Sequence, residues 1–181
     1  RLMWNRHDDQ AFERVINTPT RGIGERTVDD IRQCARAHEC SLWQAAVMLC
    51  EQQRLTARAA NAVRGFMSLV QRLDVETREE KLEKQAAAAV HGSGLYEFHK
   101  NEKGEKGLSR VENLEELIGA CAAFTPEDED QPILGQFIAT TALDAGEAQA
   151  DPNSDCVQLM TLHSAKGLEF PLVFIAGVEE G

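Results

Sequence analysis

A short polar turn near the C-terminal end carries side chains suited to binding a nucleotide. It holds His163, Lys166 and Glu169 between one apolar run, 157–162, and a second, 172–176. Such short runs are typical of buried strands in a parallel sheet, and α/β proteins bind ligands at the carboxyl ends of these strands. The three side chains could contact a phosphate, a backbone anion and a sugar hydroxyl. A solvated turn without function would have the same composition, so both interpretations stay open.

A second candidate site is the turn Gly22-Ile-Gly24, which precedes a helix predicted to begin at about Thr27. This layout is typical of a helix-hairpin-helix element. Glycine lets a phosphate approach the main chain, and the amides at a helix N-terminus can bind it without a basic surface. Arg21 and Arg26 would add positive charge. A plain turn between two helices is the alternative.

The glycine-broken segment 100–110 is a third candidate, because it is locally basic. It has four basic side chains against two acidic ones, in a chain whose net charge is −11. We predict a loop here, followed by a helix that a capping box, Ser109 with Glu112, would open. The loop is either a solvated surface or a second phosphate-contacting segment.

The length, composition, net charge and cysteine count of the chain restrict the classes of function it can have. The chain has 181 residues, 43% hydrophobic and 27% charged, which is typical of a globular protein with a sizeable core. A net charge of −11 argues against a general nucleic-acid binder, so any such contact must come from a local patch or from backbone amides. No apolar run reaches the length of a membrane span. The five scattered cysteines predict neither a disulfide framework nor a metal site, and they fit a reducing cytosol.

Helical periodicity dominates the elements that must position these residues. We predict a short helix capped by Asp8 or Asp9, a helix opened by a capping box at Ser41, and a long helix from Thr56 to about Glu80. Two more helices are predicted over 81–90 and through 133–143. The composition changes near residue 153, which divides a helical body, 1–153, from a short β-containing piece, 154–181.

Two sequence strings carry a resemblance to a known family. Thr161-Leu-His-Ser-Ala-Lys-Gly-Leu-Glu-Phe170 closely resembles motif V of the UvrD/PcrA/Rep-like superfamily 1 DNA helicases, and the string 18–24 resembles theirs as well. The resemblance covers essentially the whole chain. It implies that residues 1–153 are a 2B-type subdomain, and that 154–181 re-enter the second RecA-like α/β domain, 2A.

The resemblance also implies a function. In such helicases ATP and Mg²⁺ bind between two RecA-like domains, hydrolysis drives 3′-to-5′ motion on single-stranded DNA, and 2B contacts the duplex and regulates unwinding. By position, the nucleotide would be bound by Glu169, Lys166 and Gly167, and single-stranded DNA by Thr161 and His163. The implied duplex contacts are Arg21, Gly22, Ile23, Gly24, Arg26, Thr27, Lys103, Lys106 and Arg110. The parent enzyme would act in repair or replication, with proteins of those pathways as partners, in the bacterial cytoplasm at the nucleoid.

Parts of such a motor have no match in this sequence. There is no G-x-x-x-x-G-K-[ST] phosphate loop and no recognisable Asp-Glu pair for Mg²⁺. We therefore expect a piece of a longer protein, with no catalytic residue, no bound cofactor and no ATPase activity of its own. Its strand edges in 157–176 could mediate self-association. Two other functions stay open: a protein-interaction or autoinhibitory helical module, and a free-standing helix-hairpin-helix DNA binder.

Overall fold

The computed structural model describes residues 1–128 and 130–144, and in the C-terminal part 157, 160–161, 165–167 and 169–175. Within these residues the chain is mainly helical and has no strand, which confirms the predicted helical class. The helices are α1 (Asp9–Val15), α2 (Glu25–His38), α3 (Leu42–Glu51), α4 (Ala57–Thr77), α5 (Leu82–Gly92), α6 (Leu95–Lys100), α7 (Glu105–Ala123) and α8 (Ile133–Asp144).

The chain forms two compact units, Arg1–Ile138 and Ala139–Gly181. Of the two predicted strands, residues 158, 159, 162 and 176 lie outside the described residues. The β-containing piece therefore stays a prediction. So does the domain boundary near 153, because residues 145–156 also lie outside the described part.

The predicted caps set the start of three helices. The Asp8 carboxylate accepts a hydrogen bond from the backbone N–H of Ala11 and begins α1. Ser41 forms the predicted capping box at α3, and Thr56 caps α4. These side chains satisfy amides that have no partner inside the helix, which explains why each helix begins where the sequence predicts. α2 begins at Glu25, two residues before the predicted start at Thr27.

The prediction of a basic loop over 100–110 is wrong, because most of the segment is helical. α6 ends at Lys100 and α7 begins at Glu105, so the predicted capping serine, Ser109, lies inside α7. Gly104, the residue before α7, has φ 91°, a conformation that favours glycine. A Cβ at Gly107 would lie 2.6 Å from the carbonyl oxygen of Glu102. The two glycines therefore permit a tight helix start rather than breaking a helix.

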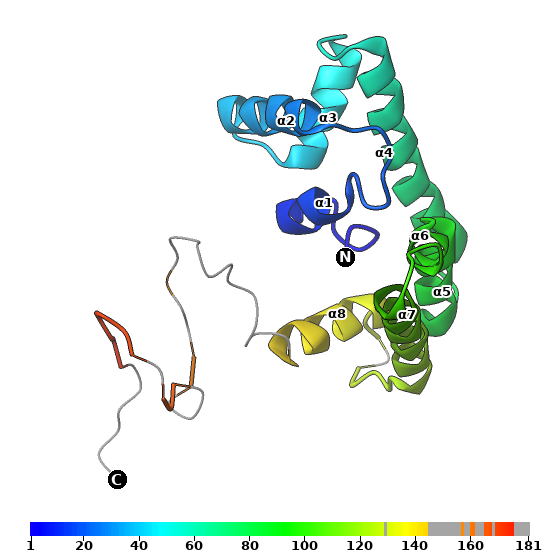
Figure 1. Cartoon of the computed structure of the whole chain (residues 1–181), viewed down its shortest axis with the longest axis vertical. Coiled ribbons are helices and arrows are strands. Elements are labelled where there is room, and N and C mark those ends of the chain that lie inside the picture. The colour runs from blue at the N-terminus through cyan, green and yellow to red at the C-terminus, as the bar shows by residue number, and fades with distance from the viewer. Residues whose placement is uncertain (129, 145–156, 158–159, 162–164, 168, 176–181) are drawn as a thin grey trace. The chain divides into compact units, whose positions relative to one another are not determined.

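The first core lies among α1, α2, α3 and α4 (Figure 1). At its centre Phe12 packs edge-to-face against Phe66, with ring centroids 5.7 Å apart, and against Trp43 at 6.3 Å. Ile23, from the turn before α2, is 1% exposed in the same core. Burying an isoleucine side chain contributes about 1.5–3 kcal/mol, so this residue anchors the turn from beneath.

A second group of helices, α5, α6 and α7, packs together beyond the end of α4 (Figure 1). Leu73 of α4 lies so close to α5 that a Cβ at Gly92 would be 2.7 Å from its Cδ2 atom. Asp74 of α4 pairs with Arg6 at 2.8 Å and with Arg78 at 3.0 Å. Through these contacts α4 joins the N-terminal core to the α5–α7 group. None of the helices in the described part of the chain is both long and apolar enough to cross a membrane.

Candidate nucleic-acid interface

The turn before α2 is held from inside by one side chain. The Oδ1 atom of Asn17 accepts a hydrogen bond from the backbone N–H of Arg21 at 2.8 Å and from that of Ile23 at 3.3 Å. Gly22, between them, has φ 77°, which an L-residue with a side chain adopts at a cost. The Asn17 amide, the glycine and the buried Ile23 side chain together fix the shape of this turn.

The start of α2 is open to a ligand. Its N-cap, Gly24, has no side chain and makes no capping hydrogen bond. The amides of Glu25 and Arg26 precede the first helical bond, which Thr27 donates to the Gly24 carbonyl at 2.9 Å. A Cβ built on Gly22 or on Gly24 would meet nothing within 4 Å. An anion can therefore approach the amides, where the helix dipole favours negative charge.

Several charged side chains near the start of α2 neutralise one another by forming ion pairs within the protein. Arg26 is exposed, while Glu25 in the same turn pairs with Arg32 at 2.8 Å. Arg32 also pairs with Glu13 at 2.6 Å and with Asp29 at 2.8 Å. The hydrogen bonds that Arg32 donates to the carboxylates of Glu13, Glu25 and Asp29 raise the pKa of its guanidinium. By pairing with one carboxylate of α1 and two of α2, Arg32 reduces the repulsion that an approaching phosphate would otherwise meet from these side chains.

Arg21 is oriented into the protein. Its Nη1 atom donates to the carbonyl oxygens of Val15 at 2.9 Å and Pro19 at 3.0 Å, and its Nη2 atom donates to that of Ser93 at 3.2 Å. Its guanidinium carbon lies 5.5 Å from the centroid of the Phe66 ring. Burial lowers the pKa of Arg21 from its ordinary value. The predicted duplex contact through this side chain stays a prediction.

The second basic segment has a different environment. Lys103 and Lys106 are exposed, whereas Arg110 pairs with Glu102 at 2.7 Å. His99 is bound to the same carboxylate through Nδ1 at 2.6 Å. The hydrogen bonds from His99 and from Arg110 lower the pKa of Glu102. Part of the positive charge predicted to bind phosphate is thus neutralised by a neighbouring carboxylate.

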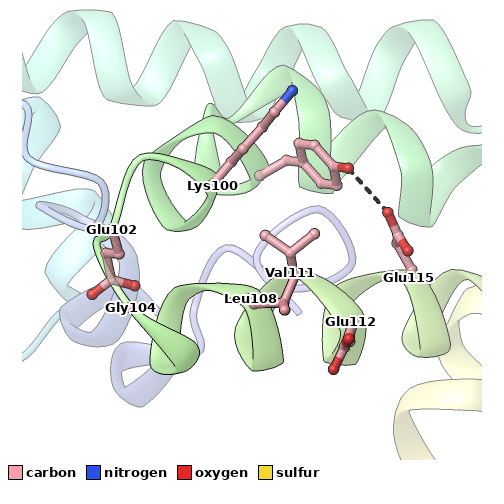
Figure 2. Close-up of a pocket in the computed structure, with 8 residues that line it drawn as sticks. Lys100, Glu102, Gly104, Leu108, Val111, Glu112 and Glu115 are labelled. Atoms are coloured by element: carbon pink, nitrogen blue, oxygen red, sulfur yellow. Dashed lines mark hydrogen bonds between the residues drawn. The ribbon is translucent and has the colours of Figure 1, made fainter.

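A surface groove of about 440 Å³ lies between α6 and the first half of α7 (Figure 2). Three carboxylates, Glu102, Glu112 and Glu115, border it, together with Lys100 and the apolar side chains Leu108 and Val111. The Tyr96 hydroxyl donates to Glu115 at 3.0 Å, and this bond raises the pKa of the tyrosine. The acidic border disfavours a phosphate inside this groove.

The predicted nucleotide and single-strand residues belong to the second unit, Ala139–Gly181. His163 lies outside the described residues. Thr161 accepts a hydrogen bond through its carbonyl from the backbone N–H of Ala165 at 3.0 Å, and Gly167 has φ 87°. Lys166 and Glu169 are exposed. Residues 165–167 form a turn, and the roles of the predicted side chains stay predictions.

Two residues that support the candidate interface were not identified from the sequence. Asn17 and Ser93 carry no motif, and they lie 76 positions apart. Asn17, two residues before Pro19, could have been recognised from the sequence as a residue that stabilises a turn, since Asn side chains often accept hydrogen bonds from nearby backbone amides. The carbonyl of Ser93 had no sequence signal, because its contact with Arg21 depends on the packing of distant helices.

Comparison with known proteins supplies the family. The model of the UvrD-like helicase C-terminal domain matches residues 1–181. The chain belongs to this family. It is similar to DNA helicase II of Escherichia coli, with 54% identity over 183 residues, and to DNA helicase II of Haemophilus influenzae, with 50% over 183 residues.

The chain is also similar to the ATP-dependent DNA helicase PcrA of Bacillus subtilis, with 34% identity over 195 residues. Each of these three alignments covers 100% of this chain and 25% of the relative. The chain thus spans about a quarter of the length of the curated relatives it matches. The predicted resemblance to the UvrD/PcrA-like DNA helicases is thereby confirmed at the level of the family.

Proposed function

We propose that this chain is the 2B-type helical region and the motif V segment of an ATP-dependent 3′-to-5′ DNA helicase. The helical part, 1–153, contacts duplex DNA and regulates unwinding, and residues 154–181 belong to the 2A domain. Support comes from membership of the UvrD-like helicase family and from relatives named DNA helicase II and ATP-dependent DNA helicase PcrA. The parent enzyme uses ATP and Mg²⁺, and its substrates are duplex and single-stranded DNA.

The observation that carries the duplex-binding role is the uncapped start of α2. Gly24 leaves the amides of Glu25 and Arg26 without a capping partner, and the space beside Gly22 and Gly24 is open. Backbone amides can bind a phosphate although the whole chain has a net charge of −11. This reconciles an acidic protein with a DNA substrate. Thr27, Lys103 and Lys106 add contacts to phosphates further along the same DNA strand or on the complementary DNA strand.

For the second unit we propose the roles that motif V has in the family. Glu169, with Lys166 and Gly167, contacts the nucleotide, and Thr161 and His163 contact single-stranded DNA. The exposed side chains of Lys166 and Glu169 and the positive φ of Gly167, 87°, are compatible with a ligand-binding turn. These residues complete a nucleotide site only together with the other half of the motor.

A duplex titration of the 181-residue chain tests the duplex-binding role. We expect weak binding at low salt that falls steeply as salt is added, because neutralised phosphates release counterions. Arg26→Gln should weaken binding and make the slope of log K against log salt shallower by about 0.9, the value for one lost phosphate contact.

The matched control is Arg36→Gln. Arg36 is also an exposed arginine of α2, but it lies in the last turn of the helix, away from the Gly24 end. This variant loses the same charge and should bind duplex as the unmodified chain does. Absence of duplex binding at low salt would contradict the proposed role of the turn. An equal loss in both variants would show only a general effect of charge.

A further inference from the structure

Arg21 connects four separate parts of the helical unit. Its guanidinium donates to Val15 at the end of α1, to Pro19 in the following loop and to Ser93 between α5 and α6, at 2.9, 3.0 and 3.2 Å. Its guanidinium carbon lies over the ring of Phe66 in α4, 5.5 Å from the centroid, and Phe66 is a core residue that is 2% exposed. In the described part of the chain, Arg21 is the residue whose side chain connects the turn before α2 to the carbonyl oxygen of Ser93.

The partners of Arg21 are those of an internal group. Three neutral carbonyl oxygens and an aromatic ring contact it, and no carboxylate among residues 1–128 and 130–144 forms an ion pair with it. Arginine stays protonated under all ordinary conditions, so the charge is held by carbonyl dipoles and the ring. A rigid fork with five donors can bond several carbonyls at once, which a lysine ammonium cannot reproduce with the same geometry.

Asn17 acts on the same turn from the other side. Its Oδ1 atom already accepts the amides of Arg21 and Ile23, which are therefore not available to a phosphate. The amides that remain for a ligand are those near Gly24 and at the start of α2. Asn17 and Arg21 hold the turn, and this second set of amides belongs to the exposed residues that follow it, 24–26.

We propose that Arg21, supported by Asn17, is a positioning residue, which fixes the Gly22–Gly24 turn against α4 and the α5–α6 connection. The duplex phosphate is then bound by main-chain amides and by Arg26, not by the Arg21 side chain. This inference rests on the proposed duplex-binding function and assigns Arg21 a role different from the phosphate contact expected from its position in the sequence. In this proposal the α5–α6 connection, through the carbonyl of Ser93, also helps to hold the DNA-binding turn in place.

The test compares a charge-preserving variant, Arg21→Lys, with a charge-removing one, Arg21→Gln, by duplex titration of the 181-residue chain over a range of salt. A positioning role predicts that both variants weaken binding to a similar extent, roughly tenfold, as expected for the loss of about one charge-assisted hydrogen bond. The salt slope should stay that of the unmodified chain. Arg26→Gln, by contrast, should make the slope shallower by about 0.9.

The opposite pattern would overturn the proposal. If Arg21 binds phosphate directly, Arg21→Lys retains most of the affinity, and Arg21→Gln makes the slope shallower by about 0.9. Circular dichroism and a thermal midpoint show whether each variant is folded. If Arg21→Gln unfolds, Arg21→Lys decides: normal duplex binding by the lysine variant overturns the proposal, and weakened binding with an unchanged slope supports it.

Amide hydrogen exchange without DNA gives a second readout that does not depend on duplex binding. We expect faster exchange at the Ile23 amide in Arg21→Lys and in Asn17→Ala, with unchanged exchange in the middle of α2 and in Arg26→Gln. Unchanged exchange at Ile23 in the Arg21 variants would overturn the positioning role. If the unmodified chain fails to bind duplex, the proposed function fails, and the exchange experiment still decides whether Arg21 fixes the turn.

Discussion

The side chain of Glu102 forms one hydrogen bond with a residue nearby in the sequence and another with a residue of the next helix. Glu102 accepts from His99, three positions before it, and from Arg110, eight positions after it in the next helix. The two donors bridge the end of α6 and the first turns of α7. The Glu102 side chain therefore supports the short Asn101–Gly104 connection, and the basic charge of Arg110 serves this bridge.

The bridge predicts a pH dependence of stability. The donors His99 and Arg110 lower the pKa of Glu102 below its ordinary value of 4.5. A carboxylate with a lowered folded-state pKa stabilises the fold above its unfolded pKa, and this contribution is lost as pH falls through the folded pKa. We expect the thermal midpoint to fall as pH is lowered from about 6 to about 3.

Glu102→Gln is the matched variant for this measurement, because it keeps the shape of the side chain and removes its titration. Relative to the unmodified chain, it should be less stable near neutral pH, and this difference should shrink in acid. A difference between the two proteins that stays constant over the whole range would show that Glu102 does not act through its charge.

The helical elements depend on where a glycine lies as much as on their apolar pattern. α7 contains two glycines with opposite surroundings. At Gly107 a Cβ would lie 2.6 Å from the carbonyl oxygen of Glu102 and 2.7 Å from that of His99, which are backbone atoms that cannot move aside easily. At Gly119 a Cβ would meet nothing within 4 Å.

These two positions give a prediction with an internal control. Gly119→Ala should stabilise the protein by about 0.5–1 kcal/mol, because alanine has the higher helix propensity. Gly107→Ala should destabilise it by about 1–3 kcal/mol, because the added methyl group displaces the turn packed against it. Urea unfolding followed by circular dichroism measures both. A stabilising effect at both positions would show that α7 can shift away from the Asn101–Gly104 connection.

The whole chain corresponds to about a quarter of each helicase relative that it matches. In P-loop NTPases, ATP hydrolysis depends on a phosphate loop, a bound metal ion and a residue that positions the attacking water, all arranged in one site. The 181-residue sequence has no phosphate loop. Its proposed part in the reaction is a half-site, supplied by Glu169 and its neighbours, and a duplex-binding surface at α2.

We therefore expect no ATP hydrolysis above background by the 181-residue chain, with or without single-stranded DNA. The release of inorganic phosphate measures this directly. A preparation made in parallel from cells that do not express the chain controls for contaminating helicases. Hydrolysis that is stimulated by DNA, copurifies with the chain and is absent from the control would contradict the half-site interpretation.

The sequence by itself determined the helical class, the caps at Asp8, Ser41 and Thr56, and the family, because caps and periodicity are local and a string of ten residues is specific. It also marked the Gly22–Gly24 turn. It failed at 100–110, since glycines that permit a tight helix start have the same composition as glycines in a loop. Only the tertiary structure decided that Arg21 points inward, because its partner Ser93 is 72 positions away and is brought close by the packing of α4 and α5.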